Sequence, residues 1–588
     1  MNEFRFSPRT NRAHEIGWMG WGDDAFARAR TENKPILLSI SAVWCHWCHV
    51  MDETSYSDPA VIAAIAQRFV PIRVDNDRRP DVNARYNMGG WPTTAFLAPD
   101  GALLTGATYL PPDQMARALD EIARFYAENQ DAIAARTMQA QTPRTDHSPV
   151  ARADLRAAMI VRLTEQLSEG FDEEFGGFGD APKFPQPEML EFLLSEWRVT
   201  GEQRLYSMVA RTILGMARGG TYDHVEGGFF RYSTTRDWSV PHFEKMAEDH
   251  AGLLRVLAQL ALFAPAGEFH ATLTSAIGYV RATLRDPATG FFAGSQDADE
   301  EYFALPLEER SRHGAPYVDR TSYTNWTCAL AGAWFLSARA LEDEALLREA
   351  CETLDGVHAR LLDPEGLTYH YVVPGGQPQV RGLLADQAAY LRALLDGHEI
   401  SGETRFFERA RVLADRILER FEGDDGGFYD RLALEAPLGR LDVLDRPIVD
   451  NGLLAESLLR LAGLGGDARY RLAAERTLAL FARTYAGAGP FAAAYGRALR
   501  RYLSPEITVR IVGGAADSDG FREAALRLPA PLATIRTVEP AAAAELELPP
   551  EPAPTAYVCM GTTCGAPVRE PAGLRAAFDA LAVAPQPG

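Results

Sequence analysis

The sequence predicts a multidomain protein with an α/β domain at the N-terminus, a large all-α toroid of six helical hairpins, (α/α)6, and a small α/β segment at the C-terminus. The 588 residues exceed the size at which a single hydrophobic core keeps growing. Strand and helix patterns alternate around a cysteine pair near the start, and a glycine-aromatic motif recurs later in the chain. The predicted parts are residues 1–137, a linker at 138–150, residues 151–500 and residues 501–588.

The composition excludes several classes of partner. With 80 acidic and 59 Lys and Arg side chains, the formal net charge is −21, which repels phosphate backbones and anionic lipid surfaces. We therefore expect no nucleic-acid and no membrane partner. The start, MNEFRFSPRTNRAHEIGW, lacks the continuous apolar core of a secretory signal, and no later segment offers about 20 uninterrupted apolar residues. A cytoplasmic location is expected.

The six cysteines are too few for a disulfide framework in so long a chain. Four of them form two close pairs, Cys45 with Cys48 and Cys559 with Cys564, and such pairs are typical of catalytic or metal-binding sites in a reducing compartment. Cys328 and Cys351 lie in helical patterns and are expected to be small buried apolar residues.

The first cysteine pair follows a predicted strand and precedes a predicted helix. The apolar run Ile36 to Ile40 predicts a buried strand, MDETSYSDPAVIAAIAQRF turns helical, and VPIRVDND predicts a second strand. At a helix start the macrodipole and the free N–H groups favour an anion, so Cys45 is expected to be the attacking thiolate. Cys48, one turn inside the helix, is expected to resolve the mixed disulfide.

Pro92, in NMGGWPTTAFLAPDG, stands between a glycine pair and a strand, where a cis peptide bond would bring backbone close to the thiols. With this proline the domain resembles the thioredoxin superfamily: Cys45 matches the attacking cysteine, Cys48 the resolving cysteine and Pro92 the cis-proline beside the active site. The longer pattern NKPILLSISAVWCHWCHVM resembles the thioredoxin-like domain of the spermatogenesis-associated family and its bacterial relatives.

The domain also differs from thioredoxins. Ser39, six residues before the first cysteine, stands where thioredoxins often carry a buried acid, so His49 or Glu53 is the candidate replacement. His46, when protonated, would stabilise the thiolate further and make the disulfide more oxidising.

Two other interpretations of this cluster stay open. A redox dithiol needs no cofactor, whereas Cys45, His46, Cys48 and His49 together suit zinc or iron, although four ligands so close in sequence crowd a tetrahedron. A dithiol without redox turnover is the other alternative. Trp44 and Trp47 are expected to pack or to form a rim.

The middle of the chain repeats a glycine-aromatic motif. The marker glycines are separated by 51, 62, 76, 61 and 62 residues, each long enough for two helices: Gly177, Gly228, Gly290, Gly366, Gly427 and Gly489. Six such hairpins are expected to close into a toroid with the glycine turns at one rim, with an open solenoid as the alternative. Four of the more apolar helices begin with Asp249, Asn325, Asp386 or Asp450. Each residue fits an N-cap, but in a closed toroid the same residues would line an axial pocket.

Three further motifs extend the resemblance over nearly the whole chain. They are FGGFGDAPKFPQPEML, GGTYDHVEGGFFRYSTTRDWSVPHFEKMAEDHAGLL and GSQDADEE. They look like the same family, whose members join a thioredoxin-like domain to a six-hairpin glycosidase-like toroid, similar in fold to glycosidases and sugar epimerases. Neither a sugar substrate nor a reaction follows from the fold.

The candidate binding residues of the toroid pocket are acidic, basic and aromatic side chains near the helix starts: Asp223, His224, Arg236, Trp238, His242, Glu244, Asp249, His250, Asp297, Asn325, Asp386 and Asp450. Two suitably spaced carboxylates would permit glycoside hydrolysis, and paired histidines would permit epimerisation. A satisfied polar ring that holds the turns together is the alternative.

The C-terminal segment is predicted as strand, helix, strand, strand, helix, and AYVCMGTTCGAPV places Cys559 and Cys564 at a strand end and a glycine turn. Three roles stay open for this second pair: a relay dithiol for Cys45 and Cys48, half of a metal site, or two unpaired buried thiols.

Three hypotheses for function follow. In the first, the dithiol exchanges disulfides with a thiol or disulfide protein or a small molecule, and the toroid selects the substrate or partner. In the second, the toroid is a carbohydrate-active enzyme, an epimerase or glycosidase, acting on a carbohydrate-like ligand with the dithiol as regulator. In the third, the protein is a non-catalytic binding module, or binds metal through Cys45, His46, Cys48 and His49.

Overall fold

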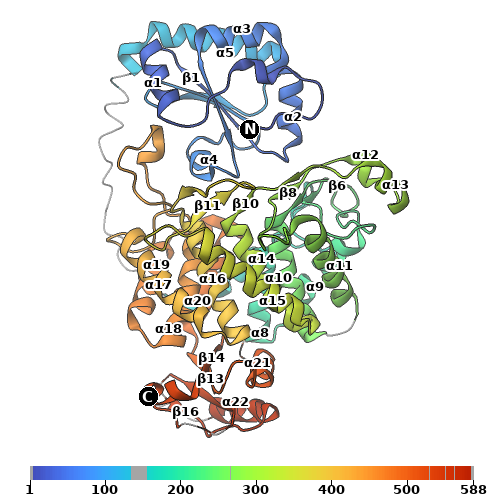
Figure 1. The fold of residues 1–588 in the computed structure, drawn as a ribbon, viewed down its shortest axis with the longest axis vertical. Helices are drawn as coiled ribbons and strands as arrows, with labels where there is room; N and C mark the ends of the chain where they lie inside the picture. Colours follow the sequence, from blue (N-terminus) through green and yellow to red (C-terminus); the bar gives the residue numbers. More distant parts are fainter. Residues whose placement is uncertain are drawn as a thin grey trace. The chain divides into compact units, whose positions relative to one another are not determined.

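The computed structural model describes residues 4–133, 135, 155–264, 267–528, 530, 532–549, 551, 553–561 and 563–583. The predicted linker at 138–150 lies outside these residues. The chain forms two compact units: unit 1 is Met1–Ser148 with Ala433–Asp445, and unit 2 is Pro149–Leu432 with Arg446–Gly588 (Figure 1). None of the described helices is long and apolar enough to cross a membrane.

Unit 1 is built on a four-stranded sheet in the order β2-β1-β3-β4. Strand β1 runs parallel to β2 and antiparallel to β3, which is antiparallel to β4. The strands are β1 (Ile36–Ser41), β2 (Val70–Asp75), β3 (Thr93–Leu97) and β4 (Leu103–Ala107). All of β1 is buried, as its apolar run predicts, because helices cover both faces of the sheet.

The side chains of β1 alternate between two hydrophobic cores. Leu37 packs with α2 (His46–Glu53), α3 (Pro59–Arg68) and α5 (Pro112–Glu128), together with the short helices η1 (Ala13–Ile16) and η2 (Ser55–Ser57). Ile36, Leu38 and Ile40 pack on the other face with α1 (Asp23–Glu32) and α4 (Pro80–Tyr86). The thioredoxin-like fold predicted from the motifs is confirmed by this arrangement.

The segment Ala433–Asp445, which contains η4 (Gly439–Asp442), belongs to unit 1 although it lies far along the chain. Leu441 is 3% exposed and packs in the core with Phe26 and Tyr86. The Tyr86 hydroxyl donates to Gly101 O at 2.7 Å and accepts from Arg440 N–H at 2.8 Å. No motif in the sequence predicts this insertion.

Unit 2 contains a closed ring of six inner helices, in which the last helix packs against the first. They are α8 (Pro187–Thr200), α10 (Ala247–Phe263), α14 (Thr324–Leu341), α16 (Leu384–Ser401), α18 (Ile448–Gly465) and α20 (Ala493–Leu503). Each inner helix pairs with an outer helix: α9 (Gln203–Arg218), α11 (Glu268–Tyr279), α15 (Glu344–Arg360), α17 (Thr404–Phe421), α19 (Ala468–Phe481) and α7 (Ala157–Ser168).

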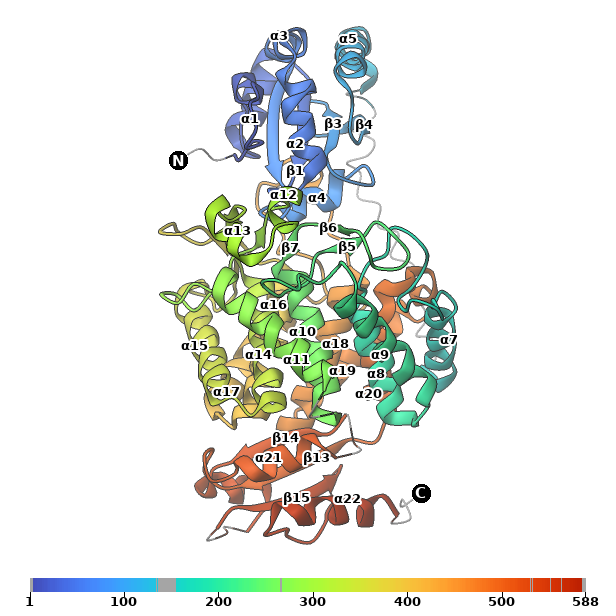
Figure 2. The ribbon, with the colours of Figure 1, turned by 90° about the vertical axis from the view of Figure 1, so that its right-hand side faces the viewer.

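The predicted (α/α)6 toroid is therefore confirmed, and the open solenoid is wrong. Inner helices such as α16 are buried on nearly every side because both the ring and the outer layer cover them, whereas outer helices such as α17 keep an exposed polar face. Figure 2 shows α15 and α17 at one edge of unit 2 and α7 and α9 at the other.

The repeated glycines form turns that follow the outer helices. All six marker glycines have a positive φ, from 56° at Gly489 to 87° at Gly366, a conformation that favours glycine. Five of the turns close with a β-bridge, as between Phe171 and Phe178 or Tyr222 and Phe229.

Short strands and helices lie at the rim of the toroid. They are β5 (Tyr232–Ser233), β6 (Pro241–His242), β7 (Lys245–Met246), β8 (Ser295–Gln296), β9 (Val318–Asp319), β10 (Ser322–Tyr323), β11 (Tyr369–Val372), β12 (Gln379–Arg381), α12 (Glu300–Phe303), α13 (Leu307–His313), η3 (Val280–Leu284) and η5 (Tyr485–Ala492).

The C-terminal segment repeats the topology of unit 1. Its sheet has the order β14-β13-β15-β16, with the first pair parallel and the other two antiparallel. The elements are β13 (Ile507–Val512), α21 (Asp519–Leu526), β14 (Thr534–Val538), η6 (Pro540–Leu546), β15 (Thr555–Met560), β16 (Thr563–Cys564), η7 (Pro571–Gly573) and α22 (Leu574–Val583). Helices α21 and α22 pack on one face, as α2, α3 and α5 do in unit 1.

Candidate functional site

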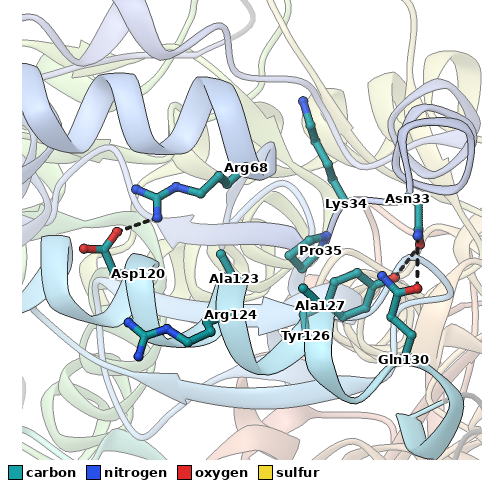
Figure 3. A pocket seen from close by; sticks show the side chains of 10 residues that line it. All are labelled: Asn33, Lys34, Pro35, Arg68, Asp120, Ala123, Arg124, Tyr126, Ala127 and Gln130. Atoms are coloured by element: carbon teal, nitrogen blue, oxygen red, sulfur yellow. Dashed lines mark hydrogen bonds and ion pairs between the residues drawn. The ribbon is translucent and has the colours of Figure 1, made fainter.

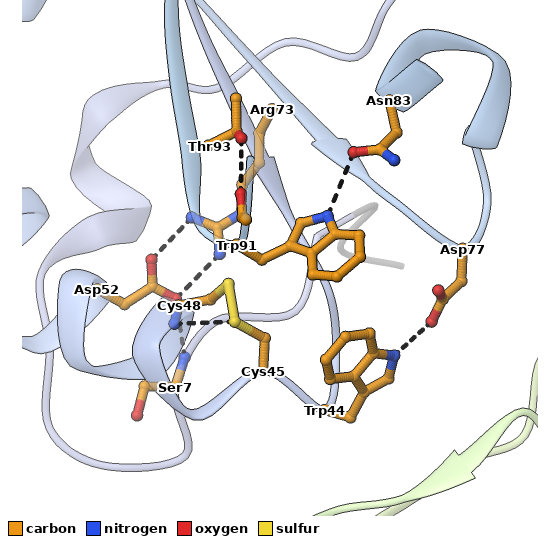
Figure 4. Close-up of a disulfide and its surroundings, with 11 residues drawn as sticks. Ser7, Trp44, Cys45, Cys48, Asp52, Arg73, Asp77, Asn83, Trp91 and Thr93 are labelled. Atoms are coloured by element: carbon orange, nitrogen blue, oxygen red, sulfur yellow. Dashed lines mark hydrogen bonds and ion pairs between the residues drawn. A yellow bond between two sulfur atoms is a disulfide. The ribbon is translucent and has the colours of Figure 1, made fainter. Parts of the chain in front are cut away.

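Cys45 and Cys48 are joined by a disulfide at the start of α2 (Figure 4). Cys45 is the N-cap of the helix, and the backbone N–H of Cys48 donates to its Sγ at 3.2 Å. The two side chains are only 5% and 2% exposed. In the reduced state the same N–H group and the helix dipole would stabilise a thiolate on Cys45.

Aromatic side chains border the disulfide. The rings of Trp44 and Trp91 meet edge to face with centroids 5.7 Å apart, and the Trp44 indole donates to Asp77 Oδ2 at 2.7 Å (Figure 4). The Trp91–Pro92 peptide bond is cis. Trp47 is 54% exposed and lies against Tyr109, so it presents an apolar surface beside the cysteines.

A buried acid that the sequence analysis missed lies on the same helix. Asp52 follows Cys48 by one helical turn, which places both on one face of α2. Its carboxylate accepts from Arg73 at 2.7 and 3.0 Å and from Ser7 N–H at 3.1 Å. Arg73 is opposite Ser39 in the β1–β2 register, so the ion pair lies beside the position where thioredoxins often carry their acid.

The two proton acceptors suggested by the sequence have different surroundings. His49 is largely desolvated, and burial followed by the charges of Arg5 and Arg73 lowers its pKa to about 4, so the ring is neutral at pH 7. Glu53 accepts from the Ser7 hydroxyl at 2.6 Å. A neutral imidazole one residue after Cys48 is chemically able to accept a proton.

No three His, Cys, Asp or Glu side chains within the described ranges are grouped so that they could hold a metal ion.

A surface pocket lies at the opposite end of β1, next to Pro35 (Figure 3). Its polar side chains bind one another: Arg68 pairs with Asp120, and Asn33 forms hydrogen bonds with Tyr126 and Gln130.

The toroid encloses a cavity of about 670 Å³ at the starts of its inner helices. Three of the four predicted helix-start residues line it: Asp249, Asn325 and Asp450. The fourth, Asp386, is fully buried; its carboxylate lies 3.0 Å from His370 Nδ1 and accepts from Asn325 N–H at 3.1 Å.

The other predicted pocket residues lie outside this cavity lining. Asp223 is buried against Lys245 and Arg310, and Arg236 donates to both carboxylate oxygens of Asp172. Trp238 is fully buried with a φ of 64°. The remaining residues form hydrogen bonds at the rim of the toroid. His224 bonds with Gly219 O, His242 with Glu244, and His250 with Phe229 N–H and Met246 O. Asp297 is buried, and its N–H donates to Tyr317 O.

The second cysteine pair forms a disulfide across the β15–β16 hairpin, where Cys559 and Cys564 face each other in register. Cys559 is fully buried and Cys564 is partly exposed. Of the two free cysteines, Cys328 is buried and Cys351 is half-buried.

Known proteins are similar to parts of this chain. Residues 8–143 match the family described as Thioredox_DsbH, protein of unknown function DUF255. The chain is 37% identical over 329 residues to spermatogenesis-associated protein 20 of Homo sapiens, covering 52% of this chain and 41% of the human protein. The matched region thus spans about two fifths of that relative. The resemblance to the spermatogenesis-associated family is confirmed.

Two more distant similarities each concern one part of the chain. An 82-residue stretch is 38% identical to thiol:disulfide interchange protein DsbD 1 of Pseudomonas aeruginosa, covering 13% of this chain and 14% of that protein. The structure of cellobiose 2-epimerase from Bacillus thermoamylovorans superposes with a TM-score of 0.46 and 13% identity, covering 56% of this chain and 88% of that one.

Proposed function

We propose that unit 1 catalyses thiol–disulfide exchange through Cys45 and Cys48. The observation that carries this proposal is the position of the Cys45 sulfur at the N-cap of α2, where the Cys48 N–H donates to it. A thiolate there is stabilised before any substrate arrives, because the donor and the helix dipole are fixed by the fold.

The exchange needs two displacement steps. The Cys45 thiolate attacks one sulfur of the substrate disulfide, which forms a mixed disulfide and releases the other substrate sulfur as a thiolate that takes up a proton. Cys48 then loses its proton, for which the neutral ring of His49 is the nearest candidate base in sequence, and its thiolate attacks the Cys45 sulfur. The second substrate sulfur leaves as a thiolate and takes up the proton that Cys48 lost, and two electrons have passed from the dithiol to the substrate.

The surroundings of the dithiol support a macromolecular substrate. Trp47 is an exposed aromatic residue directly between the two cysteines, and it packs on Tyr109. Exposed aromatic surface next to a reactive group is typical of sites that contact an extended substrate. One relative of this domain is named as a thiol:disulfide interchange protein, in keeping with the same class of reaction.

Insulin reduction by the full chain, with dithiothreitol as electron donor, tests the proposal. Cys45→Ser should abolish turnover, and Cys48→Ser should trap a mixed disulfide that mass spectrometry detects. Glu244→Gln, in unit 2, is the control and should leave turnover unchanged. A wild-type protein whose Cys45–Cys48 disulfide is reduced by dithiothreitol but which does not accelerate insulin reduction above the rate with dithiothreitol alone would contradict the proposal.

A further inference from the structure

The cavity at the axis of the toroid is large enough for a small organic molecule. Its volume of about 670 Å³ lies within the range of ligand sites, roughly 300 to 1,000 Å³. It is lined by the starts of all six inner helices, each of which packs against its neighbours in the ring. Nothing in the thiol–disulfide proposal involves it.

The ionic side chains at the floor of the cavity neutralise one another. Arg255 donates to Glu191 at 2.8 Å and to Asp396 at 2.6 Å. Arg392 also pairs with Glu191, and Arg497 lies 2.9 Å from Glu188. Because each acid here has its own guanidinium, the floor offers little net charge to a ligand.

The carboxyl groups on the wall are not neutralised in this way. In the described parts of the chain, no hydrogen bond or ion pair reaches the carboxyl oxygens of Glu248, Asp249 or Asp450. The charge of Arg231 acts on Glu248 and Asp249, whereas the charges that act on Asp450 are those of two further acids, Asp386 and Asp430. Asp249 Oδ2 and the side-chain oxygen of Asn325 are buried hydrogen-bond acceptors without a donor.

Aromatic side chains complete the lining. Trp326 lies at the start of α14, and Phe184 and Phe491 are 40% and 68% exposed. Aromatic faces bind both the carbon skeleton of a ligand and, through the ring quadrupole, its positive charge.

We infer that this cavity binds a small organic cation, an amine or guanidine compound, whose charged group meets Glu248, Asp249 and Asp450 while its carbon body packs on Trp326 and Phe491. Such a ligand supplies the donors that Asp249 and Asn325 lack, and it balances the charge of the wall. A neutral sugar also supplies donors, but it gains nothing from ionised carboxyl groups, so its affinity should not increase as they lose their protons.

This assignment has a pH dependence. Burial first, and then neighbouring acids, raises the pKa of both Asp249 and Asp450 to about 7. A bound cation favours the ionised form of these carboxyl groups. At a pH where the free protein carries protons on Asp249 and Asp450, binding must therefore release those protons. The affinity for a permanently charged ligand should therefore increase as the pH rises from about 6 to about 8.

Isothermal titration calorimetry of the full chain tests the inference, with agmatine and putrescine as cationic probes and 1,4-butanediol and glucose as neutral ones. We expect one saturable site per chain for a cationic probe, at least threefold tighter at pH 8 than at pH 6. Asp249→Asn and Asp450→Asn should each weaken it at least tenfold at pH 8. Glu419→Gln, which removes an exposed acid of α17, should leave the affinity unchanged.

Circular dichroism melting of each variant separates a lost contact from a lost fold. Saturable binding of glucose or butanediol as tight as that of the amines would overturn the inference, and so would amine binding that Glu419→Gln weakens as much as Asp450→Asn. The absence of saturable binding by either cationic probe at 10 mM would also overturn it.

Discussion

The ammonium group of Lys245 lies 2.8 Å from the carboxylate of Asp223, and neither side chain is more than 2% exposed. Lys245 also donates to Gly227 O at 2.8 Å, inside the glycine turn that Asp223 begins. The same arrangement recurs one repeat earlier, where Lys183 donates to Asp172 at 2.7 Å and to Gly176 O at 3.0 Å. In both turns the aspartate also binds an arginine.

Replacing Asp223 by Asn should destabilise unit 2 strongly. The substitution leaves Lys245 as a buried cation without its anion, while Arg310 keeps Glu226, and removing one partner of a buried pair typically costs about 3–5 kcal/mol. Urea unfolding followed by circular dichroism measures the loss. Glu419→Gln, an exposed ion-pair partner, is the control and should change stability by less than about 0.5 kcal/mol. A loss below about 1 kcal/mol for Asp223→Asn would show that the pair contributes little.

Alanine substitutions at two of the marker glycines distinguish the cost of backbone strain from the cost of steric overlap. Gly177→Ala places a Cβ 2.4 Å from the Trp238 ring at a φ of +78°, whereas Gly366→Ala, at a φ of +87°, meets nothing within 4 Å. Gly366→Ala should cost about 1–2 kcal/mol from the left-handed backbone alone. Gly177→Ala should cost at least about 2 kcal/mol more because Trp238 is buried and cannot withdraw. Equal thermal shifts for the two variants would show that the turn relaxes freely.

Replacing Asp450 by Asn should stabilise the free protein, with an effect that depends on pH. Because burial raises the pKa of Asp450 from 3.8 to about 7, the folded state favours the neutral acid. That favourable contribution is complete below pH 3.8 and is lost as the pH rises through about 7. The Asn variant should therefore gain over the wild type as the pH rises from 4 to 7, reaching on the order of 2 kcal/mol at pH 8.

Urea unfolding at pH 4.5, 6 and 8 measures this gain, and Asp415→Asn, at a partly exposed helix position, is the control. A variant that is less stable than the wild type at pH 8 would indicate that the Asp450 carboxylate is compensated in solution.

Breaking the second disulfide should have a limited effect on stability. Cys559 and Cys564 are five residues apart, and so short a loop gives an entropic stabilisation of only about 2 kcal/mol. The hairpin also keeps its backbone contact from Gly565 N–H to Val558 O at 2.9 Å. Unfolding of the Cys559→Ala, Cys564→Ser double variant by urea should show this loss, with insulin reduction unchanged. Loss of insulin reduction with an intact fold would instead support the relay role.

The parts of the fold that depend on local geometry could be predicted from the sequence. Gly177 and its five counterparts could be found because only glycine adopts the turn conformation readily, and their spacing matches a helical hairpin. The placement of Cys45 between strand and helix followed in the same way from hydrophobic periodicity.

The parts that depend on partners distant in sequence could not be predicted. Asp386 has the same position in its helix as Asp450, yet His370, on a neighbouring strand, binds it and removes it from the cavity. Asp52, on α2, forms an ion pair with Arg73 of β2, which the sheet register places opposite Ser39. The spacing of four residues from Cys48 was a usable signal for Asp52, whereas no local signal assigned Leu441 to the core of unit 1.

The insertion of residues 433–445 into unit 1 affects the order in which the protein matures during translation. After Ser148 has been added, the ribosome must add 284 more residues, Pro149 to Leu432, before it starts the final piece of unit 1. At about 5–20 residues per second this takes roughly 15 to 60 seconds. During that time the apolar side chains that Leu441 later covers, among them Phe26 and Tyr86, are exposed to solvent and accessible to chaperones. The first domain to leave the ribosome is therefore completed only after most of the toroid has been synthesised.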